Sequence, residues 1–342
     1  MKNINEQVLD TVMKRGVLMT YHIRYWRAHK KLNPEDIGIA KESVNEKLVS
    51  LGHKKLVSSD VLETFALLES RAGTLINRHS FDFMHGVGRY VPNTALQTVM
   101  TEWGKLREEF WAKVTEFKAN YTDIRRKAKV EWYEAAVKLV PDPQRLVDAI
   151  EKSYPSDAEL DNYFAFDQHV FQIALPEETS VSDWIQESEE VLQARTEAAQ
   201  HARSTILAGV NGFVDGCVTQ MRQDLAGLVT DMQEAVAHGK IGVHQRTLNR
   251  LGTFIEQYKM LNFAEDSQLE KELEDFQAKF LNTSAEDYRA DQIAQRSLLV
   301  GLSNLRQTAQ QMIAEGSSSV VAGFGKAGAR KLDLGAAPGS IS

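Results

Sequence analysis

The hydrophobic positions of the chain follow a seven-residue repeat over one long stretch. The repeat consists of Leu96, Trp103, Phe110, Phe117 and Ile124. Such spacing is typical of an amphipathic, coiled-coil-like helix with one apolar face. The helical pattern continues to Leu139 and stops at Pro141-Asp142-Pro143, because proline disfavours helical backbone in the residue before it. The pattern therefore predicts a long amphipathic helix over residues 94–139.

Three segments in which apolar and polar positions alternate predict strands. They are residues 17–26, 79–92 and 163–176. Gly86 and Gly88 in the second segment indicate a bend or a hairpin. Because the three segments lie far apart in sequence, we expect a small antiparallel or mixed sheet that holds the N-terminal half together. Helices are predicted over residues 3–15 and from a cap at Ser58-Ser59-Asp60 to about Asn77.

From residue 182 onward the pattern is helical almost throughout. A cap at Ser182-Asp183 precedes a first long apolar stripe, and two further helices are predicted over residues 244–262 and 267–281. Thr283-Ser284-Ala285-Glu286 is typical of a capping box that begins a fourth helix. The apolar face predicted for this fourth helix consists of Ile293, Leu298, Leu302, Leu305 and Met312. Helices of this kind predict an antiparallel bundle.

The predicted fold is α+β and α-dominated, with a small sheet and a long amphipathic helix followed by a C-terminal antiparallel helical bundle. We expect an N-terminal helix over residues 1–16, an α+β domain over residues 17–176 and the bundle over residues 182–314. Residues 315–342 lack periodicity and are rich in Gly, Ala and Ser, which predicts a flexible tail and a candidate docking peptide.

The composition narrows the classes of protein that the chain represents. With 342 residues and 43% hydrophobic content, the chain can bury a substantial core. Cys217 is the single cysteine, which excludes an intrachain disulfide and a multi-cysteine metal site and favours a reducing compartment. We therefore expect a cytoplasmic protein. No segment reaches the ~18 consecutive apolar residues that a membrane-spanning helix requires.

Charge is unevenly distributed along the chain. The net charge is −7, but residues 1–140 carry 23 Lys and Arg against 17 Asp and Glu, whereas residues 141–342 carry 17 against 30. The candidate contacts to a protein partner or nucleic acid are Lys30, Lys31, Lys54, Lys55, Arg125, Arg126, Lys127 and Lys129. The aromatic residues near them are Tyr25, Trp26, Trp132 and Tyr133, which would stack bases while the cations contact phosphates. A solvated basic face is the alternative, and the opposite signs of the two halves favour it.

The remaining motifs indicate little chemistry. His79 and His85 would lie ~20 Å apart on a straight strand, too far to share a metal ion. The segment from Gly323 to Gly328 lacks the spacing of a phosphate-binding loop, and no helix clearly follows it. Cys217 lies on an apolar stripe, where a buried thiol is expected. The sequence therefore predicts no catalytic residue, no cofactor and no metal site, and we expect a non-enzymatic protein.

Three glycines in the first bundle helix allow two interpretations. Gly209, Gly212 and Gly216 follow one another at spacings of three and four residues. In a membrane this spacing indicates close contact between helices. In a soluble bundle the same glycines permit tight backbone packing, which the interleaved Asn211 and Asp215 favour.

The order and spacing of several motifs resemble a known family. The motifs are the segments from Trp26 to Gly38, from Leu51 to Val57 and from Phe166 to Phe171, together with Arg71-Ala72 and the trailing helices. They resemble domain-of-unknown-function family 3150 over roughly residues 17 to 310. The family occurs in bacteria, phages and integrative mobile elements, and it supplies no catalytic residues to carry over. Its genes often lie near that of a MoxR-type AAA+ ATPase resembling a cobaltochelatase subunit, and sometimes near that of a von Willebrand A-type protein.

The leading hypothesis is a non-enzymatic phage or mobile-element protein that works in a protein assembly. The resemblance implies an adaptor or partner of a MoxR-type AAA+ ATPase, and homo-oligomerisation is open. The first alternative is a nucleic-acid-associated protein that uses the basic N-terminal half. The second alternative is a helical membrane-active effector, although a membrane partner is not the expectation.

Overall fold

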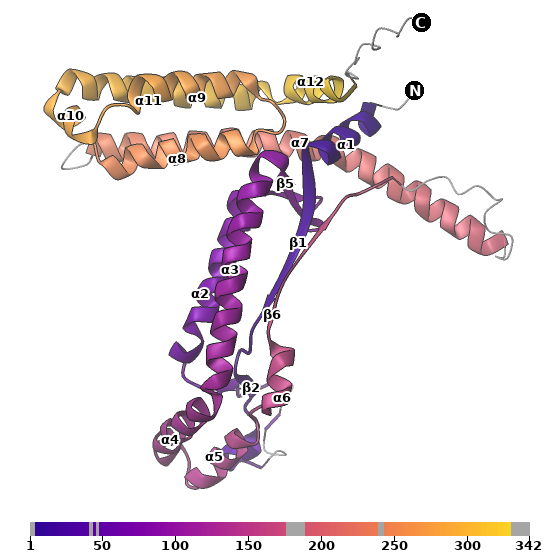
Figure 1. Ribbon diagram of the computed structural model, residues 1–342, viewed down its shortest axis with the longest axis vertical. Coiled ribbons are helices and arrows are strands. Elements are labelled where there is room, and N and C mark those ends of the chain that lie inside the picture. The colour runs from indigo at the N-terminus through magenta and orange to yellow at the C-terminus, as the bar shows by residue number, and fades with distance from the viewer. Residues whose placement is uncertain (1–3, 41–43, 46–47, 176–188, 239–242, 330–342) are drawn as a thin grey trace, which may run out of the picture. The chain divides into compact units, whose positions relative to one another are not determined.

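The computed structural model describes residues 4–40, 44–45, 48–175, 189–238 and 243–329 (Figure 1). Helices predominate, and the strands form a four-stranded sheet and a two-stranded ribbon, so the predicted α-dominated α+β fold is confirmed. The chain divides into two compact units. The bundle unit comprises residues 1–19, 78–97 and 170–342, and the ribbon unit comprises residues 20–77 and 98–169. The predicted domain over residues 17–176 contributes residues to both.

The four-stranded sheet contains the three segments predicted as strands. Its order is β4-β5-β1-β6, with β1 at Gly16–Arg24, β4 at Phe81–Phe83, β5 at Gly88–Pro92 and β6 at Ala165–Phe171. β5 is antiparallel to both β4 and β1. The turn between β4 and β5 has positive φ at Met84, His85 and Gly86, a conformation that glycine adopts without a steric penalty. The hairpin predicted at this place is confirmed.

The helix predicted over residues 94–139 is interrupted at a single residue. α3 (Asn93–Ala119) and α4 (Tyr121–Leu139) are separated by Asn120, whose φ is −96° and ψ is 2°. Asn120 Nδ2 donates to the Glu116 carbonyl at 3.0 Å. Asparagine side chains compete in this way with helical hydrogen bonds. The seven-residue repeat does not reveal this break, because Asn120 lies between two positions of the repeat.

The ribbon unit is built around a cluster of aromatic side chains. Its remaining elements are β2 (His29–Lys31), η1 (Pro34–Ile37), β3 (His53–Lys55), α2 (Asp60–Arg78), α5 (Pro143–Glu151), α6 (Asp157–Leu160) and η3 (Asp161–Tyr163). The Phe65 ring of α2 lies 5.6 Å from Phe110, 5.9 Å from Phe117 and 5.5 Å from Phe164, measured between centroids. Phe110 and Phe117 belong to the predicted repeat, so the apolar face of α3 does cover this core.

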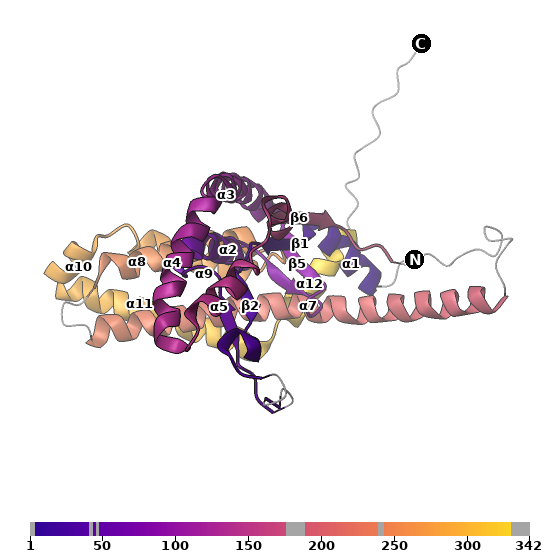
Figure 2. The same cartoon turned by 90° about the horizontal axis from the view of Figure 1, so that it is seen from below.

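The bundle unit contains the predicted C-terminal helices together with the predicted N-terminal helix and one helix that was not predicted. Its helices are α1 (Ile4–Arg15), α7 (Glu189–His238), α8 (Gln245–Leu261), α9 (Ser267–Phe280), α10 (Ala285–Ala290), α11 (Gln292–Glu315) and α12 (Ser318–Ala329). α7 packs against α8 and α11, and α8 packs against α9. The N-terminal turns of α7 run clear of the other helices of this unit (Figure 1 and Figure 2), and residues 193–198 are exposed. The cap predicted at Ser182-Asp183 lies outside the described residues.

The β4–β5 hairpin supplies part of the core of the bundle unit. The Phe83 ring lies 4.8 Å from Phe213 of α7, and the Tyr90 ring lies 4.8 Å from Phe263, again between centroids. Phe83 and Tyr90 are fully buried. The β4–β5 hairpin, part of the sheet that was predicted to hold the N-terminal half together, therefore also packs on the bundle helices.

The fourth predicted bundle helix is two helices. Asp291 begins α11 as its N-cap, because its carboxylate accepts hydrogen bonds from the N–H groups of Ile293 at 2.8 Å and Ala294 at 3.2 Å. The prediction that Ile293 faces the core is wrong, since its side chain is 80% exposed in the first turn of α11. The cap of α10 is Ser284, whose hydroxyl accepts from the Asp287 N–H.

The tail predicted to be flexible from residue 315 instead forms α12 over Ser318–Ala329. Gly316 ends α11 with a φ of 77°. Phe324 of α12 is 2% exposed, with its ring 5.8 Å from that of Phe263 and 5.3 Å from the Arg15 guanidinium. The prediction was wrong here because a short Gly/Ala-rich helix owes its stability to tertiary packing, not to its own periodicity. Residues 330–342 lie outside the described part of the chain.

No helix within the described ranges has the length and the apolar character needed to cross a membrane.

Candidate interaction site

The two Lys-Lys phrases pair with one another in the ribbon unit. β2 and β3 are antiparallel, with His29 opposite Lys55, Lys30 opposite Lys54 and Lys31 opposite His53. Backbone hydrogen bonds from Leu32 N to Gly52 O (3.1 Å) and from Leu56 N to Ala28 O (2.7 Å) close the two ends of this ribbon. The structure thus brings together four of the eight predicted site residues. They form two adjacent pairs, and more than twenty positions separate the pairs in the sequence.

One of these lysines is a structural residue. Lys54 is 5% exposed, and its ammonium group lies 2.8 Å from the Asp36 carboxylate. Asp36 also accepts a hydrogen bond from the Asn33 N–H, which anchors the turn of η1. A buried ammonium group requires such a partner, because its desolvation is otherwise too costly. Lys54 is therefore unavailable to an external anion.

The other three ribbon lysines are exposed. Lys55 Nζ donates to Ser59 Oγ at 3.0 Å, which leaves its ammonium group at the surface. Lys30 lies near Glu159 of α6. Hydrogen bonds from the N–H and hydroxyl of Ser156 hold the pKa of Glu159 below its usual range, and the charge of Lys30 acts in the same direction. Lys30, Lys31 and Lys55 therefore form the accessible positive charge of the ribbon, next to an acidic neighbour.

Helices α4 and α5 are attached to the end of β3 by two aromatic side chains. Trp132 Nε1 of α4 donates to the Lys55 carbonyl at 2.9 Å. The Tyr154 hydroxyl, which follows α5, donates to the Leu56 carbonyl. Burial is the main cause that raises the pKa of Tyr154, to about 12, so the phenol keeps its proton at neutral pH. These bonds place both rings beside the basic residues of α4.

Three of the four predicted cations on α4 have partners among the described residues of the ribbon unit. The Arg125 guanidinium lies over the rings of Tyr121 (5.7 Å) and Tyr154 (5.1 Å). Two ion pairs, Arg126 with Asp123 (2.7 Å) and Lys129 with Glu151 (2.6 Å), are solvent-exposed. Exposed pairs of this kind are worth only about 0–1 kcal/mol, so a ligand can compete with them. Lys127 is exposed on α4, and no ion pair is seen for it among the described residues.

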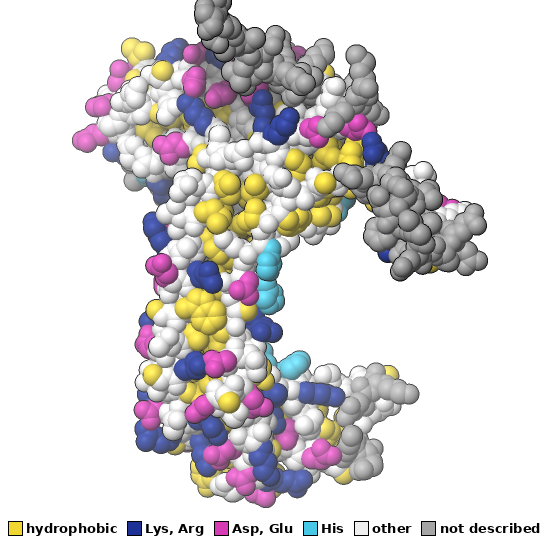
Figure 3. All heavy atoms as spheres, turned by 45° about the vertical axis from the view of Figure 1, so that its right-hand side comes forward, with side chains coloured by type: hydrophobic (Ala, Val, Ile, Leu, Met, Phe, Trp, Pro, Cys, Tyr) yellow, Lys and Arg dark blue, Asp and Glu magenta, His cyan; other side chains and the backbone are white. Residues whose placement is uncertain are grey.

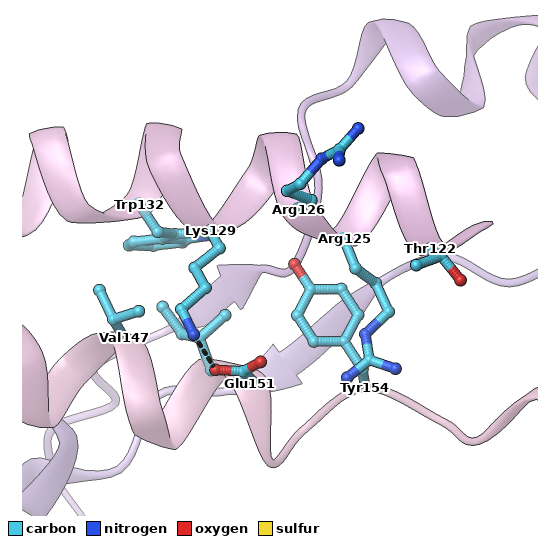
Figure 4. A pocket seen from close by; sticks show the side chains of 9 residues that line it. Thr122, Arg125, Arg126, Lys129, Trp132, Val147, Glu151 and Tyr154 are labelled. Carbon is cyan, nitrogen blue, oxygen red and sulfur yellow. Dashed lines mark hydrogen bonds and ion pairs between the residues drawn. The ribbon is translucent and has the colours of Figure 1, made fainter. Parts of the chain in front are cut away.

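A pocket of about 340 Å³ lies between α4 and α5. Its lining consists of Thr122, Arg125, Arg126, Lys129, Trp132, Val147, Ile150, Glu151 and Tyr154. Figure 4 shows Lys129 reaching across to Glu151, Arg125 lying on Tyr154, and Arg126 extending away from α5. The pocket unites three of the predicted cations with one predicted aromatic residue, Trp132. Lys127 does not line it.

Two predicted aromatic contacts are wrong. Tyr25 is 6% exposed and stacks on Phe65 with ring centroids 5.6 Å apart. Trp26 is 3% exposed and packs against the rings of Phe117 and Tyr121. Both rings are part of the core of the ribbon unit, so neither is available to stack on a base.

The structure also accounts for the glycine-rich segment near the C-terminus and for the single cysteine. The segment from Gly323 to Gly328 lies within α12 and not at the start of a helix. Cys217 is buried, which raises the pKa of its thiol well above the usual range, and the prediction of a buried thiol is confirmed. In the described residues, no group of three or more His, Cys, Asp and Glu side chains is placed to hold a metal ion.

The three glycines do not show the tight backbone packing that was expected of them. A Cβ at Gly209 would lie 2.6 Å from Met84 Cε, which is the end of a flexible side chain and not backbone. A Cβ at Gly212 or Gly216 would meet nothing within 4 Å. Tight backbone packing at these two positions is therefore not observed.

Two features of α4 and α5 were missed at the level of sequence. Val147, Ile150, Glu151 and Tyr154 complete the pocket, and their approach to α4 depends on the turn at Pro141-Asp142-Pro143. A second feature is an apolar row on α4, formed by Val130, Tyr133 and Val137, which are 56%, 48% and 56% exposed. The spacing of three and four residues between them puts all three on one helix face, and it was readable in the sequence.

Comparison with family models identifies the kinship of the chain. The model of the family described as protein of unknown function (DUF3150) matches residues 13–212, more than half of the chain. The chain belongs to this family. The part shared with DUF3150 contains the whole ribbon unit, the pocket and the apolar row. The chain has no significant match among curated proteins or solved structures.

Proposed function

We propose that this DUF3150 protein is a non-enzymatic, cytoplasmic interaction protein of a phage or mobile element, and that it works in a protein assembly. The observation that supports the proposal is the apolar row on α4. Its three side chains occupy successive turns of one helix face and are each about half exposed. Apolar side chains that gather on one exposed helix face mark protein–protein contacts more often than isolated ones do.

The size of the apolar row sets its contribution to binding. Complete burial of a Val or Tyr side chain contributes roughly 1.5–3 kcal/mol. Because each side chain of the row is about half exposed, a partner that covers it gains about half of that amount at each position. Covering the row therefore contributes about 3 kcal/mol, or about two orders of magnitude in affinity. This is enough to decide whether a partner is retained during purification.

The partner that the family resemblance implies is a MoxR-type AAA+ ATPase, so this ATPase is the first candidate. The test is affinity purification of the full chain from its native host, followed by mass spectrometry with and without nuclease treatment. We expect the partner to remain after nuclease treatment and to be lost from the triple variant V130S/Y133S/V137S. Leu67→Ser is the matched control, because Leu67 is an exposed apolar residue, at 56%, on α2 of the same unit. Equal recovery from the triple variant and from the control would refute the role of the apolar row.

A nucleic-acid-associated role is the second candidate. It is supported by the pairing of the two Lys-Lys phrases and by the exposure of Lys30, Lys31 and Lys127. Figure 3 shows, however, that Lys and Arg side chains on the visible face of the ribbon unit are interspersed with Asp and Glu. This role predicts binding that weakens steeply with salt and with charge reversal at these three lysines. Absence of binding to DNA and RNA at low salt would remove it.

A further inference from the structure

The α4–α5 pocket has an apolar interior. Its floor is formed by Val147 and Ile150, which are 2% and 1% exposed. The two aromatic residues that line it have already committed their polar atoms, since Trp132 Nε1 donates to the Lys55 carbonyl and the Tyr154 hydroxyl donates to the Leu56 carbonyl. Both side chains therefore offer ring surface to a ligand and no free hydrogen-bond donor.

The rim of the pocket is positively charged. Arg125, Arg126 and Lys129 lie on the α4 side, and Glu151 is the only acidic side chain among the lining residues. The carboxylate of Glu151 is held by Lys129 at 2.6 Å, and Arg126 pairs with Asp123 at 2.7 Å in an exposed ion pair that a ligand can replace. Arg125 lies over the rings of Tyr121 and Tyr154, and no carboxylate partner is seen for it among the described residues. A ligand that matches this pattern has an apolar body and negative charge beside it.

Peptide chemistry fits this pattern better than nucleic-acid chemistry. A nucleobase inserted between Trp132 and Tyr154 would place polar ring atoms against the side chains of Val147 and Ile150, which offer them no hydrogen bond, at a cost in free energy. An aliphatic or aromatic side chain carries no such cost. The volume of about 340 Å³ lies at the small end of ligand pockets, which suits one anchoring side chain.

We infer that the α4–α5 pocket binds an acidic peptide segment of a partner protein. One apolar side chain of the segment inserts against Val147 and Ile150, and its flanking Asp or Glu carboxylates pair with Arg125 and Arg126. This inference rests on the proposed role as an interaction protein and names the chemistry of the partner segment. The apolar row lies on the same helix, so a longer partner can contact both.

The test uses the full-length protein and a fluorescein-labelled peptide, Asp-Glu-Leu-Glu-Asp, with blocked termini. Binding is followed by fluorescence anisotropy, and occupancy of the pocket is followed by the NMR signals of the Val147 and Ile150 methyl groups. We expect replacement of the peptide Leu by Ser to weaken binding at least about tenfold, because the buried side chain is lost. That comparison needs no protein variant, so it does not depend on how a variant folds.

The protein variants address the charge at the rim. Arg126→Glu is expected to weaken peptide binding by about threefold or more, with a larger effect at low salt. Lys138→Glu is the matched control, because Lys138 is also exposed on α4 but does not line the pocket. Circular dichroism of both variants checks that the helices are retained.

Three outcomes would overturn the inference. They are no peptide binding, binding that is equal for the Leu and Ser peptides, and binding without a shift of the Val147 and Ile150 methyl signals. An oligothymidylate of the same charge that binds the pocket while the peptide does not would assign it to nucleic acid instead. If the peptide does not bind but the apolar-row variant no longer retains its protein partner, this inference is rejected and the proposed function still stands.

Discussion

Lys54→Met is the change that most directly separates a structural role of the Lys-Lys phrases from a binding role. The side chains of Lys54 and Asp36 are 4% and 11% exposed and lie 2.8 Å apart. Removing one partner of a buried ion pair typically costs about 3–5 kcal/mol. Asp36 retains the hydrogen bond from the Asn33 N–H and some contact with solvent, so we expect a cost at or just below the bottom of this range, about 2–3 kcal/mol.

The assay is urea unfolding followed by tryptophan fluorescence. Trp26, Trp103, Trp111 and Trp132 all belong to the ribbon unit, so their emission reports mainly on that unit. With a urea dependence of about 2 kcal/mol per M, a loss of about 2–3 kcal/mol in the free energy of unfolding lowers the unfolding midpoint by roughly 1–1.5 M.

Two further variants make the reasoning on Lys54 testable. Lys55→Met is the matched control, because Lys55 is exposed and we expect its loss to cost less than about 1 kcal/mol. The double variant K54M/D36N should lose less free energy of unfolding than the two single variants lose together. We expect the difference to be about 1–3 kcal/mol, since the two side chains interact. Equal stability of the Lys54→Met and Lys55→Met variants, with additive double-variant losses, would contradict the assignment of Lys54 to the framework.

Three other predictions concern the attachment of individual elements. Tyr154→Phe leaves the Leu56 carbonyl without its donor, at an expected cost of about 1–2 kcal/mol in the free energy of unfolding at neutral pH. Burial raises the pKa of Tyr154 to about 12, above its value of about 10 in the unfolded chain. The stabilisation by the Tyr154 hydroxyl is therefore complete below pH 10 and falls as pH rises from 10 to 12. A difference in unfolding free energy between the wild type and Tyr154→Phe that stays constant up to pH 12 would argue against this. Phe324→Ala removes a buried side chain of α12, and hydrogen exchange should show the amides of α12 losing most of their protection while those of α8 keep it. Asp291→Ala removes the N-cap of α11 at a cost of about 1 kcal/mol in thermal or urea unfolding, and Asp291→Asn should recover most of it.

The course of the main helices was readable in the sequence. The repeat from Leu96 to Ile124 predicted the face of α3 that packs on Phe65, and the stripes of the bundle helices predicted α8 and α9 to within a residue or two at each end. This worked because burial of one helix face requires apolar residues at helical spacing, whatever the face packs against. The breaks at Asn120 and Asp291 were missed, since a single side-chain-to-backbone hydrogen bond changes the chain locally without disturbing that spacing.

The candidate site was predictable in part for a similar reason. The eight basic residues were recognised from charge alone, but charge does not reveal that Lys54 is buried against Asp36 or that Tyr25 and Trp26 belong to the core. The pocket also needed Val147, Ile150 and Tyr154, which follow a proline turn. Their distance from Arg125 in space depends on the angle of that turn.

The sequence by itself determined the main helices, the segments of the four-stranded sheet, the polarity of charge and the kinship with DUF3150. These properties depend on periodicity, composition and the order of motifs, all of which are local or additive along the chain. The tertiary structure alone decided that the two Lys-Lys phrases pair in one ribbon, that one of the four lysines is internal, and that α12 is a helix. Each of these depends on what lies opposite a residue in space, because burial, ion pairing and the stability of a short helix are set by partners distant in the chain.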